Sequence, residues 1–122
     1  MNITTGVDLI ELIRVEGAIQ RHGNQFLERI YTPKEIDHFK DSLESLAVRF
    51  AAKEAVSKAL GSGIGNVNWQ EIEILRDDMD APVLNLHGKA LQRAELLGFR
   101  KWSVSLSHTD RYAVAFVVAL GE

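Results

Sequence analysis

Apolar positions cover almost every side of residues 46–60 when this segment is drawn as a helix at about 100° per residue. Its centre reads RFAAKEAVSKAL, in which alanine, valine, leucine and phenylalanine leave little room for a solvated face. We therefore expect a long interior helix that begins between Leu43 and Leu46. It is expected to end at Gly61, since glycine suits a left-handed C-terminal cap.

Two charged residues, Glu54 and Lys58, lie on one edge of this apolar helix. A partly buried carboxylate needs an opposite charge, a hydrogen-bond donor or a metal ion, because leaving it unpaired is costly. One interpretation is a surface ion pair between residues four apart, which is worth roughly 0.2–0.5 kcal/mol. The crowding by Phe50 and the neighbouring alanines favours a functional site instead.

Alternating and helical patterns predict the remaining elements. The segment Thr32-Pro33-Lys34-Glu35 is a capping-box start for a helix. Helices are expected at residues 12–23, 26–30, 33–40 and 87–97, and strands at residues 3–11, 69–75, 83–86, 102–109 and 112–120. The second and third strands are expected to pair, and the last two to form a hairpin. This order predicts an α+β fold in which a small antiparallel sheet packs against the long interior helix, with the helices on one side.

Length and composition bound the class of protein. The 122 residues predict a single domain over residues 1–122, with 46% hydrophobic and 25% charged residues as in ordinary soluble proteins. The absence of cysteine excludes disulfides, thiolate metal sites and a cysteine nucleophile. The longest apolar run, residues 113–120, is too short to span a bilayer, and no export signal is visible at the amino terminus. We therefore expect a cytoplasmic protein that does not insert into a membrane.

The charge distribution narrows the choice of partner. A net charge of −3 argues against a general nucleic-acid binder. Residues 12–34 differ from the rest, because Arg14, Arg21, Arg29 and Lys34 outnumber the two glutamates there. This basic segment is compatible with docking an acidic partner and equally with a solvated helix face.

Asp8 is unusual because it stands inside the apolar strand segment Gly6-Val7-Asp8-Leu9-Ile10. Aspartate is depleted in strands, so its presence there needs a reason. The residue could be satisfied by backbone amides or face water at the end of the strand. If Asp8 and Glu54 converge, two carboxylates and water molecules make a Mg²⁺ site of the kind that also ligates a substrate phosphate.

Two further segments carry weaker signals. The glycines at 61, 63 and 65 allow close backbone approach to a phosphate, but they follow a helix instead of preceding one, which favours a plain C-cap loop. His108 and Thr109 end a strand of strictly alternating residues beside Asp110-Arg111, where polar side chains can reach a ligand. A histidine at a hairpin end can equally be a structural hydrogen-bonding group.

Three segments together resemble the holo-acyl-carrier-protein synthases, the short bacterial type of 4′-phosphopantetheinyl transferase. They are GVDLIELIR at residues 6–14, RFAAKEAVSKALG at residues 49–61 and SLSHT at residues 105–109. The resemblance runs over the whole chain in order, and its middle segment is highly specific. It implies the 4′-phosphopantetheinyl transferase fold and transfer of phosphopantetheine from coenzyme A to a serine of acyl carrier protein, in support of fatty acid biosynthesis.

The resemblance also implies roles for individual residues. Asp8 and Glu54 would hold Mg²⁺ against the pyrophosphate, Glu54 would accept the serine proton, and Lys58 would neutralise phosphate charge. The nucleotide end would be held by Arg49, by Gly61, Gly63 and Gly65, and by His108 with Thr109. Arg14 and Arg21 would dock the acidic carrier protein. The family is trimeric with coenzyme A between subunits, so these groups would meet across a subunit interface.

One position departs from the larger pantetheinyl transferases, which carry a further acid two residues after the first. That position is Ile10 here, so water is expected to complete the metal shell. Two alternatives remain open at this stage: a non-catalytic module that binds coenzyme A or a nucleotide, and a transferase that serves polyketide or peptide-synthetase carriers.

Overall fold

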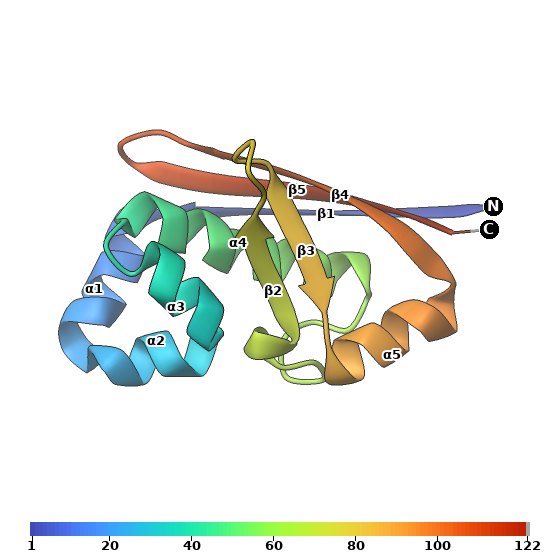
Figure 1. Cartoon of the computed structure of the whole chain (residues 1–122), viewed down its shortest axis with the longest axis horizontal. Coiled ribbons are helices and arrows are strands. Elements are labelled where there is room, and N and C mark those ends of the chain that lie inside the picture. Colours follow the sequence, from blue (N-terminus) through green and yellow to red (C-terminus); the bar gives the residue numbers. More distant parts are fainter. Residues whose placement is uncertain (122) are drawn as a thin grey trace.

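The other elements are arranged around helix α4 (Leu43–Ala59) in the computed structural model, which describes residues 1–121. The helices lie on one side of a long antiparallel sheet (Figure 1). The strands are β1 (Asn2–Glu11), β2 (Ile72–Arg76), β3 (Pro82–Leu86), β4 (Phe99–His108) and β5 (Tyr112–Gly121). The other helices are α1 (Leu12–His22), α2 (Asn24–Ile30), α3 (Pro33–Phe39) and α5 (Gly88–Leu97), with a 3₁₀ turn at Trp69–Glu71.

The main sheet has the order β1-β5-β4, and β2 pairs with β3 in a separate two-stranded sheet. Side chains alternate between the two faces of each strand, so the register decides which residues meet α4. The inward face of β5 carries only small residues, all of them fully buried: Ala113, Ala115, Val117 and Ala119. Small side chains on the sheet meet the alanines of α4, and the helix therefore lies close to the strands.

Strand β1 approaches α4 most closely at Gly6. A β-carbon built on Gly6 would overlap the carbonyl oxygen of Ala55. The hydroxyl of Thr4 donates to the carbonyl of Ala59 at 2.9 Å, one turn further along the helix. These two contacts fix the distance between β1 and α4, and with it the distance between the side chains that follow on each.

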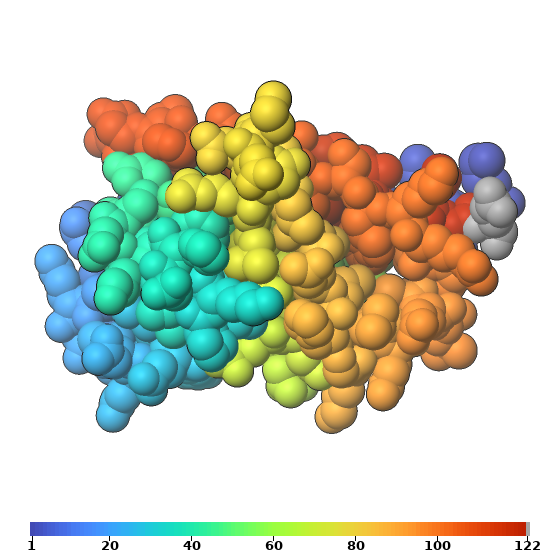
Figure 2. All heavy atoms as spheres, viewed as in Figure 1, coloured from blue at the N-terminus to red at the C-terminus, as the bar shows by residue number. Residues whose placement is uncertain are grey.

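The far side of α4 meets α3 and the β2–β3 sheet. The helix α3 begins at the predicted capping box, in which Thr32 Oγ1 accepts from the backbone N–H of Glu35 and Glu35 Oε1 accepts from the N–H of Thr32. A second apolar cluster fills this side, with Tyr31, Phe39 and Leu46 at its centre. Figure 2 shows α1 to α3 gathered at one end of the molecule and α5 at the other.

The expected fold class is confirmed, and two boundaries were wrong. Residues 69–71 form a 3₁₀ turn where a strand was expected, because Glu71 Oε1 accepts from the N–H of Asn68 at 2.7 Å and closes a turn there. Strand β4 begins at Phe99, directly after the left-handed Gly98, and not at Trp102. Among residues 1–121, no helix combines the length and the apolarity needed to cross a membrane.

The close approach at Gly6 gives a testable prediction. Gly6→Ala should lower the free energy of unfolding by about 1–3 kcal/mol, because a methyl group there forces β1 away from α4. Thermal or urea unfolding measures this change.

Gly17→Ala is the matched control, since its new methyl would meet only the flexible end of Arg21, with Nη1 at 3.0 Å. That change should be neutral or stabilise the helix by about 0.5–1 kcal/mol. Equal stability of Gly6→Ala and the unsubstituted protein would contradict the close-contact account.

Candidate active site

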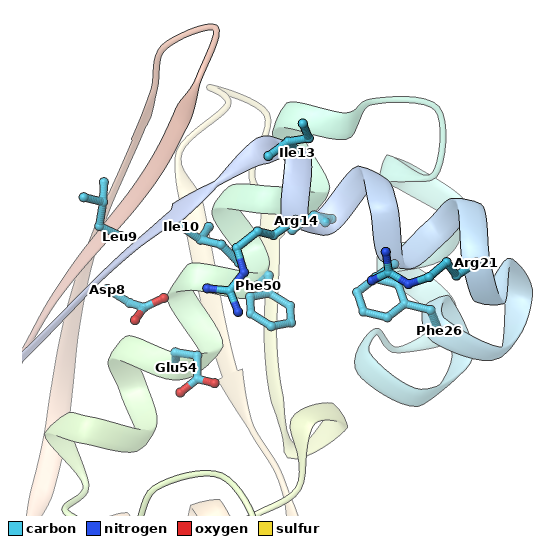
Figure 3. Close-up of a pocket in the computed structure, with 11 residues that line it drawn as sticks. Asp8, Leu9, Ile10, Ile13, Arg14, Arg21, Phe26, Phe50 and Glu54 are labelled. Carbon is cyan, nitrogen blue, oxygen red and sulfur yellow. The ribbon is translucent and has the colours of Figure 1, made fainter.

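Asp8 and Glu54 face the same cleft from two different elements (Figure 3). Asp8 is on the inward face of β1, two residues after Gly6, and Glu54 precedes the Ala55 that Gly6 touches. The close packing of strand and helix therefore brings two carboxylates to one cleft of about 590 Å³. The predicted convergence of the two acids is what the structure shows.

Lys58 joins this pair from the next turn of α4. Its ammonium group lies 3.0 Å from Oδ1 of Asp8 and also donates to the carbonyl of Val7 at 3.0 Å. The lysine thus pairs across to the strand, and the alternative pair with Glu54 on the helix is not formed. The Lys58 side chain is half exposed, so the contact contributes little to stability and can be exchanged for another anion.

The negative charge of the cleft affects the pKa of Glu54. Burial raises the pKa of the Glu54 carboxyl, the nearby Asp8 raises it further, and Lys58 opposes both. Two carboxylates with one partly exposed cation leave unbalanced negative charge, which a hard divalent cation with oxygen ligands would relieve. Among residues 1–121 no three His, Cys, Asp or Glu side chains gather as ligands, so a divalent cation in this cleft would have two carboxylate ligands from the chain and water or phosphate at its other positions.

The rest of the cleft is basic and apolar. Arg14 and Arg21 of α1 both line it; Figure 3 shows Arg14 directed toward the two acids and Arg21 at the opposite end, beside Phe26. The apolar wall includes Ile13, Val15, Ala18, Phe26 and Phe50. A cleft with acids at one end and arginines along an apolar wall suits a ligand that carries phosphate and a partner that carries acidic groups.

Arg49 lies in a second cavity of about 420 Å³, which His108 also lines. The Arg49 Nε donates to the carbonyl of Ile74 at 2.8 Å and Nη1 to that of Ser45 at 3.3 Å, while its guanidinium stacks 3.5 Å from the ring centre of Phe39. Burial lowers the pKa of Arg49 to about 10, so the group stays charged at neutral pH. Only part of its donor capacity is used by the chain, which leaves Nη2 for an anion.

The three glycines of the loop after α4 and Thr109 lie outside the cleft of the two acids. Gly61, Gly63 and Gly65 have φ of 70°, 66° and 117°, the left-handed range that favours glycine, and Gly65 lines a separate cavity beside Trp69. The hydroxyl of Thr109 accepts from the N–H of Arg111 and of Tyr112, at 3.2 and 3.0 Å, so it closes the β4–β5 turn. Within one chain, the predicted nucleotide-holding residues are thus not in the cleft of the acids.

Sequence reasoning missed the buried pair Lys53 and Glu35. Both side chains are fully buried, and Lys53 Nζ lies 2.7 Å from Glu35 Oε1. A helical projection of residues 49–57 could have suggested that Lys53 is buried. Lys53 lies on one face of the helix with Arg49 and Ser57, each one turn away, in a segment rich in alanine. The partner on α3 is 18 residues away and could not be identified from that pattern.

The sequence and the fold of this chain match those of known proteins. The family model of the 4′-phosphopantetheinyl transferase superfamily matches residues 4–117. A holo-[acyl-carrier-protein] synthase from Herpetosiphon aurantiacus is 51% identical, over 98% of this chain and 99% of that protein. One from Koribacter versatilis is 46% identical, over 97% and 98%. The crystal structure of the Helicobacter pylori holo-[acyl-carrier-protein] synthase in complex with coenzyme A superposes with a TM-score of 0.87 at 35% identity, covering 95% of this chain and 99% of that one.

These matches first define a class of transferase: the fold is that of a 4′-phosphopantetheinyl transferase. Within that class, the chain belongs to the holo-[acyl-carrier-protein] synthase family. The resemblance stated from the sequence is therefore confirmed. Enzymes of this family transfer 4′-phosphopantetheine from coenzyme A to a serine of apo-acyl carrier protein.

The raised pKa of Glu54 predicts a pH-dependent effect on stability. A folded-state pKa above the ordinary value of 4.5 means that stability falls as pH rises from that value through the folded pKa. Glu54→Gln removes this loss, so at pH 7 the variant should unfold at a higher temperature than the unsubstituted protein. The difference should vanish below pH 4.5, where the carboxyl is protonated in both states.

Thermal unfolding over this pH range checks the prediction. Glu16→Gln is the control, because it removes an exposed carboxylate of α1 and changes the net charge by the same amount. If Glu54→Gln is less stable than the unsubstituted protein at pH 7, the described electrostatics of the cleft are wrong.

Proposed function

We propose that this chain transfers 4′-phosphopantetheine from coenzyme A to an apo-acyl carrier protein, with Mg²⁺ held by Asp8 and Glu54. The observation that carries the proposal is the convergence of these two carboxylates in one cleft, with Lys58 bound to Asp8, in a chain of this family. Bound there, Mg²⁺ would neutralise the pyrophosphate of coenzyme A and stabilise charge that develops in transfer. The assignment of these residues rests on their geometry and on the resemblance of their motifs.

The ammonium group of Lys58 would neutralise charge on the phosphates of coenzyme A. Its ammonium is half exposed and bound to Asp8 by a contact that a phosphate can replace. Transfer of a phosphoryl-type group depends mainly on position and on charge neutralisation, which a lysine at the edge of the cleft provides. No covalent intermediate on the protein is needed.

Glu54 is the proposed acceptor of the serine proton, directly or through a water molecule. The serine oxygen attacks the phosphorus that carries pantetheine, and a new phosphodiester bond forms. The bond between this phosphorus and the bridging oxygen of the pyrophosphate breaks, and its electron pair leaves with that oxygen on adenosine 3′,5′-bisphosphate. The carboxylate of Glu54 faces the cleft beside Asp8, where it can accept that proton.

Arg14 and Arg21 are proposed to dock the carrier protein along α1. Both line the cleft of the acids, and Arg14 is directed toward them. Acidic groups of a carrier can pair with these arginines while its serine enters between α1 and the acids. The carrier would be that of fatty acid biosynthesis in the cytoplasm; carriers of polyketide or peptide synthetases are the alternatives that a panel of carrier proteins separates.

The outer face of the main sheet supports a homotrimer. This face is opposite to the helices and exposes large apolar side chains that none of residues 1–121 covers: Ile3, Val7, Leu9, Tyr112 and Phe116. An exposed apolar sheet face of this kind is typical of a protein–protein interface. In the proposed trimer, Arg49, the glycine loop and the pair His108–Thr109 reach the nucleotide end of coenzyme A, whose pyrophosphate is held by Asp8 and Glu54 of a neighbouring subunit.

Light scattering tests this assembly, since a trimer has three times the 13.6 kDa of one chain. The mass of a single chain at working concentration would contradict a site shared between subunits.

Asp8→Ala and Glu54→Ala should each lower the rate of transfer by about 10²–10³-fold or more, because each removes a charge that positions the reacting phosphate. The assay incubates the protein with apo-carrier, coenzyme A and Mg²⁺ and weighs the carrier by mass spectrometry. Both variants should still unfold in one cooperative transition and keep the mass of the unsubstituted assembly.

Asp37→Ala is a suitable control, since it removes an exposed carboxylate of α3 that lies neither in the cleft of the acids nor on the outer face of the sheet. Near-normal turnover in either acid variant would contradict the metal assignment. A carrier left unmodified by the unsubstituted protein, over a range of carriers, would favour a module that binds coenzyme A without catalysis.

A further inference from the structure

Two cations of α4 bind the backbone of β2. Arg49 Nε donates to the carbonyl of Ile74, and Lys53 Nζ donates to that of Ile72. The cations are one helical turn apart, about 6 Å along the axis, and the carbonyls are two strand residues apart, about 6.6 Å. The spacings match, so the two bonds together define where α4 lies along β2.

The Lys53 end of this connection has complete hydrogen bonding. The ammonium, which has three N–H donors, contacts Glu35 Oε1, the carbonyl of Ile72 and, at 3.1 Å, the carbonyl of Trp69. Glu35 in turn accepts from the N–H of Ile74 at 2.8 Å through Oε2. Helix α3, helix α4 and strand β2 therefore meet at one fully buried ion pair.

Such a pair is a poor means of adding stability. Removing two charges from water costs several kcal/mol per ion, and an uncharged, well-packed replacement is often as stable. The arrangement does restrict geometry, because every donor and acceptor of the pair is hydrogen-bonded and any shift of α4 along its axis would break several bonds at once. The pair is better explained by the position that it gives to α4.

Glu54 is the next residue after Lys53, on the side of α4 that faces β1. On that side the Gly6–Ala55 contact sets the distance between helix and strand. It does not prevent α4 from sliding or rotating, whereas the bonds of Lys53 do. The two sides together determine where the Glu54 carboxylate stands relative to Asp8.

We propose that Lys53 and Glu35 are positioning residues, which hold α4 in the register that aims Glu54 at Asp8. The inference rests on the proposed function of the two acids as the metal-binding and reacting groups. A displacement of a reacting group by about 1 Å can cost 10²-fold in rate, so a small shift of α4 has a large effect on turnover.

The test is the double variant Glu35→Gln/Lys53→Met, which removes both charges together. We expect it to keep the fold and the assembly, with a kcat lower by about tenfold or more and a KM for coenzyme A changed by less than about threefold. Binding of Mn²⁺, followed by electron paramagnetic resonance without substrate, should weaken by about tenfold, because the two carboxylates no longer meet in one geometry. Ile30→Val, a small deletion in the second apolar cluster, controls for general loss of packing and should change neither readout.

Lys53→Gln is the second variant. Its amide can donate to one carbonyl of β2, but it is one atom shorter and leaves the buried Glu35 without its ion-pair partner, so the same losses should occur and the free energy of unfolding should fall as well. A folded double variant with unchanged kcat and unchanged Mn²⁺ binding would overturn the inference. If neither variant folds at 10 °C with coenzyme A present, the pair serves stability and the inference is also wrong. Failure of the unsubstituted protein to bind Mn²⁺ or to modify any carrier would instead contradict the proposed function.

Discussion

The contact between β1 and α4 is the constraint on which the candidate site depends. Gly6 leaves no room between the strand and the carbonyl of Ala55, and the alanines of β5 and α4 let helix and sheet approach over their whole length. Asp8 lies two residues after Gly6 on β1, and Glu54 lies one residue before Ala55 on α4. Two carboxylates that would repel each other are thus held at one cleft by apolar packing that lies beside them, with Lys58 as their only cationic partner among the described ion pairs.

Helix α4 also separates two kinds of surface. On one side it presents the acids to a cleft lined by α1, and on the other it presents Arg49 to the cavity lined by His108. In the proposed function a single chain does not bring both sides to one coenzyme A, and the exposed apolar face of the sheet is the proposed place for neighbouring chains. The division of the site over α4 and the uncovered sheet face are therefore two consequences of the same layered fold.

Much of this could be predicted from local patterns. The apolar circumference of α4 predicted an interior helix, and the segment at Thr32 predicted a capping box. The inward orientation of Asp8 was one of the alternatives that the sequence left open. The family could be named because its motifs are contiguous. What could not be predicted depends on contacts between distant residues: Lys58 pairs with Asp8 across 50 positions, and Lys53 is neutralised from α3. The turn at residues 69–71 was missed because a side-chain contact of Glu71 overrides the strand propensity of its neighbours.

The activity of mixed assemblies tests most directly the claim that the acids and the nucleotide-holding residues of different chains form one site. Asp8→Ala and His108→Glu are each expected to be inactive, the second because it sets a carboxylate against phosphate. When the two chains are co-expressed in equal amounts, about a quarter of the sites in a cyclic trimer combine an intact Asp8 with an intact His108 of the neighbour. The account predicts that transfer recovers to about that fraction of the unsubstituted rate. Mixed trimers that form, as native mass spectrometry would show, and yet remain inactive would contradict it.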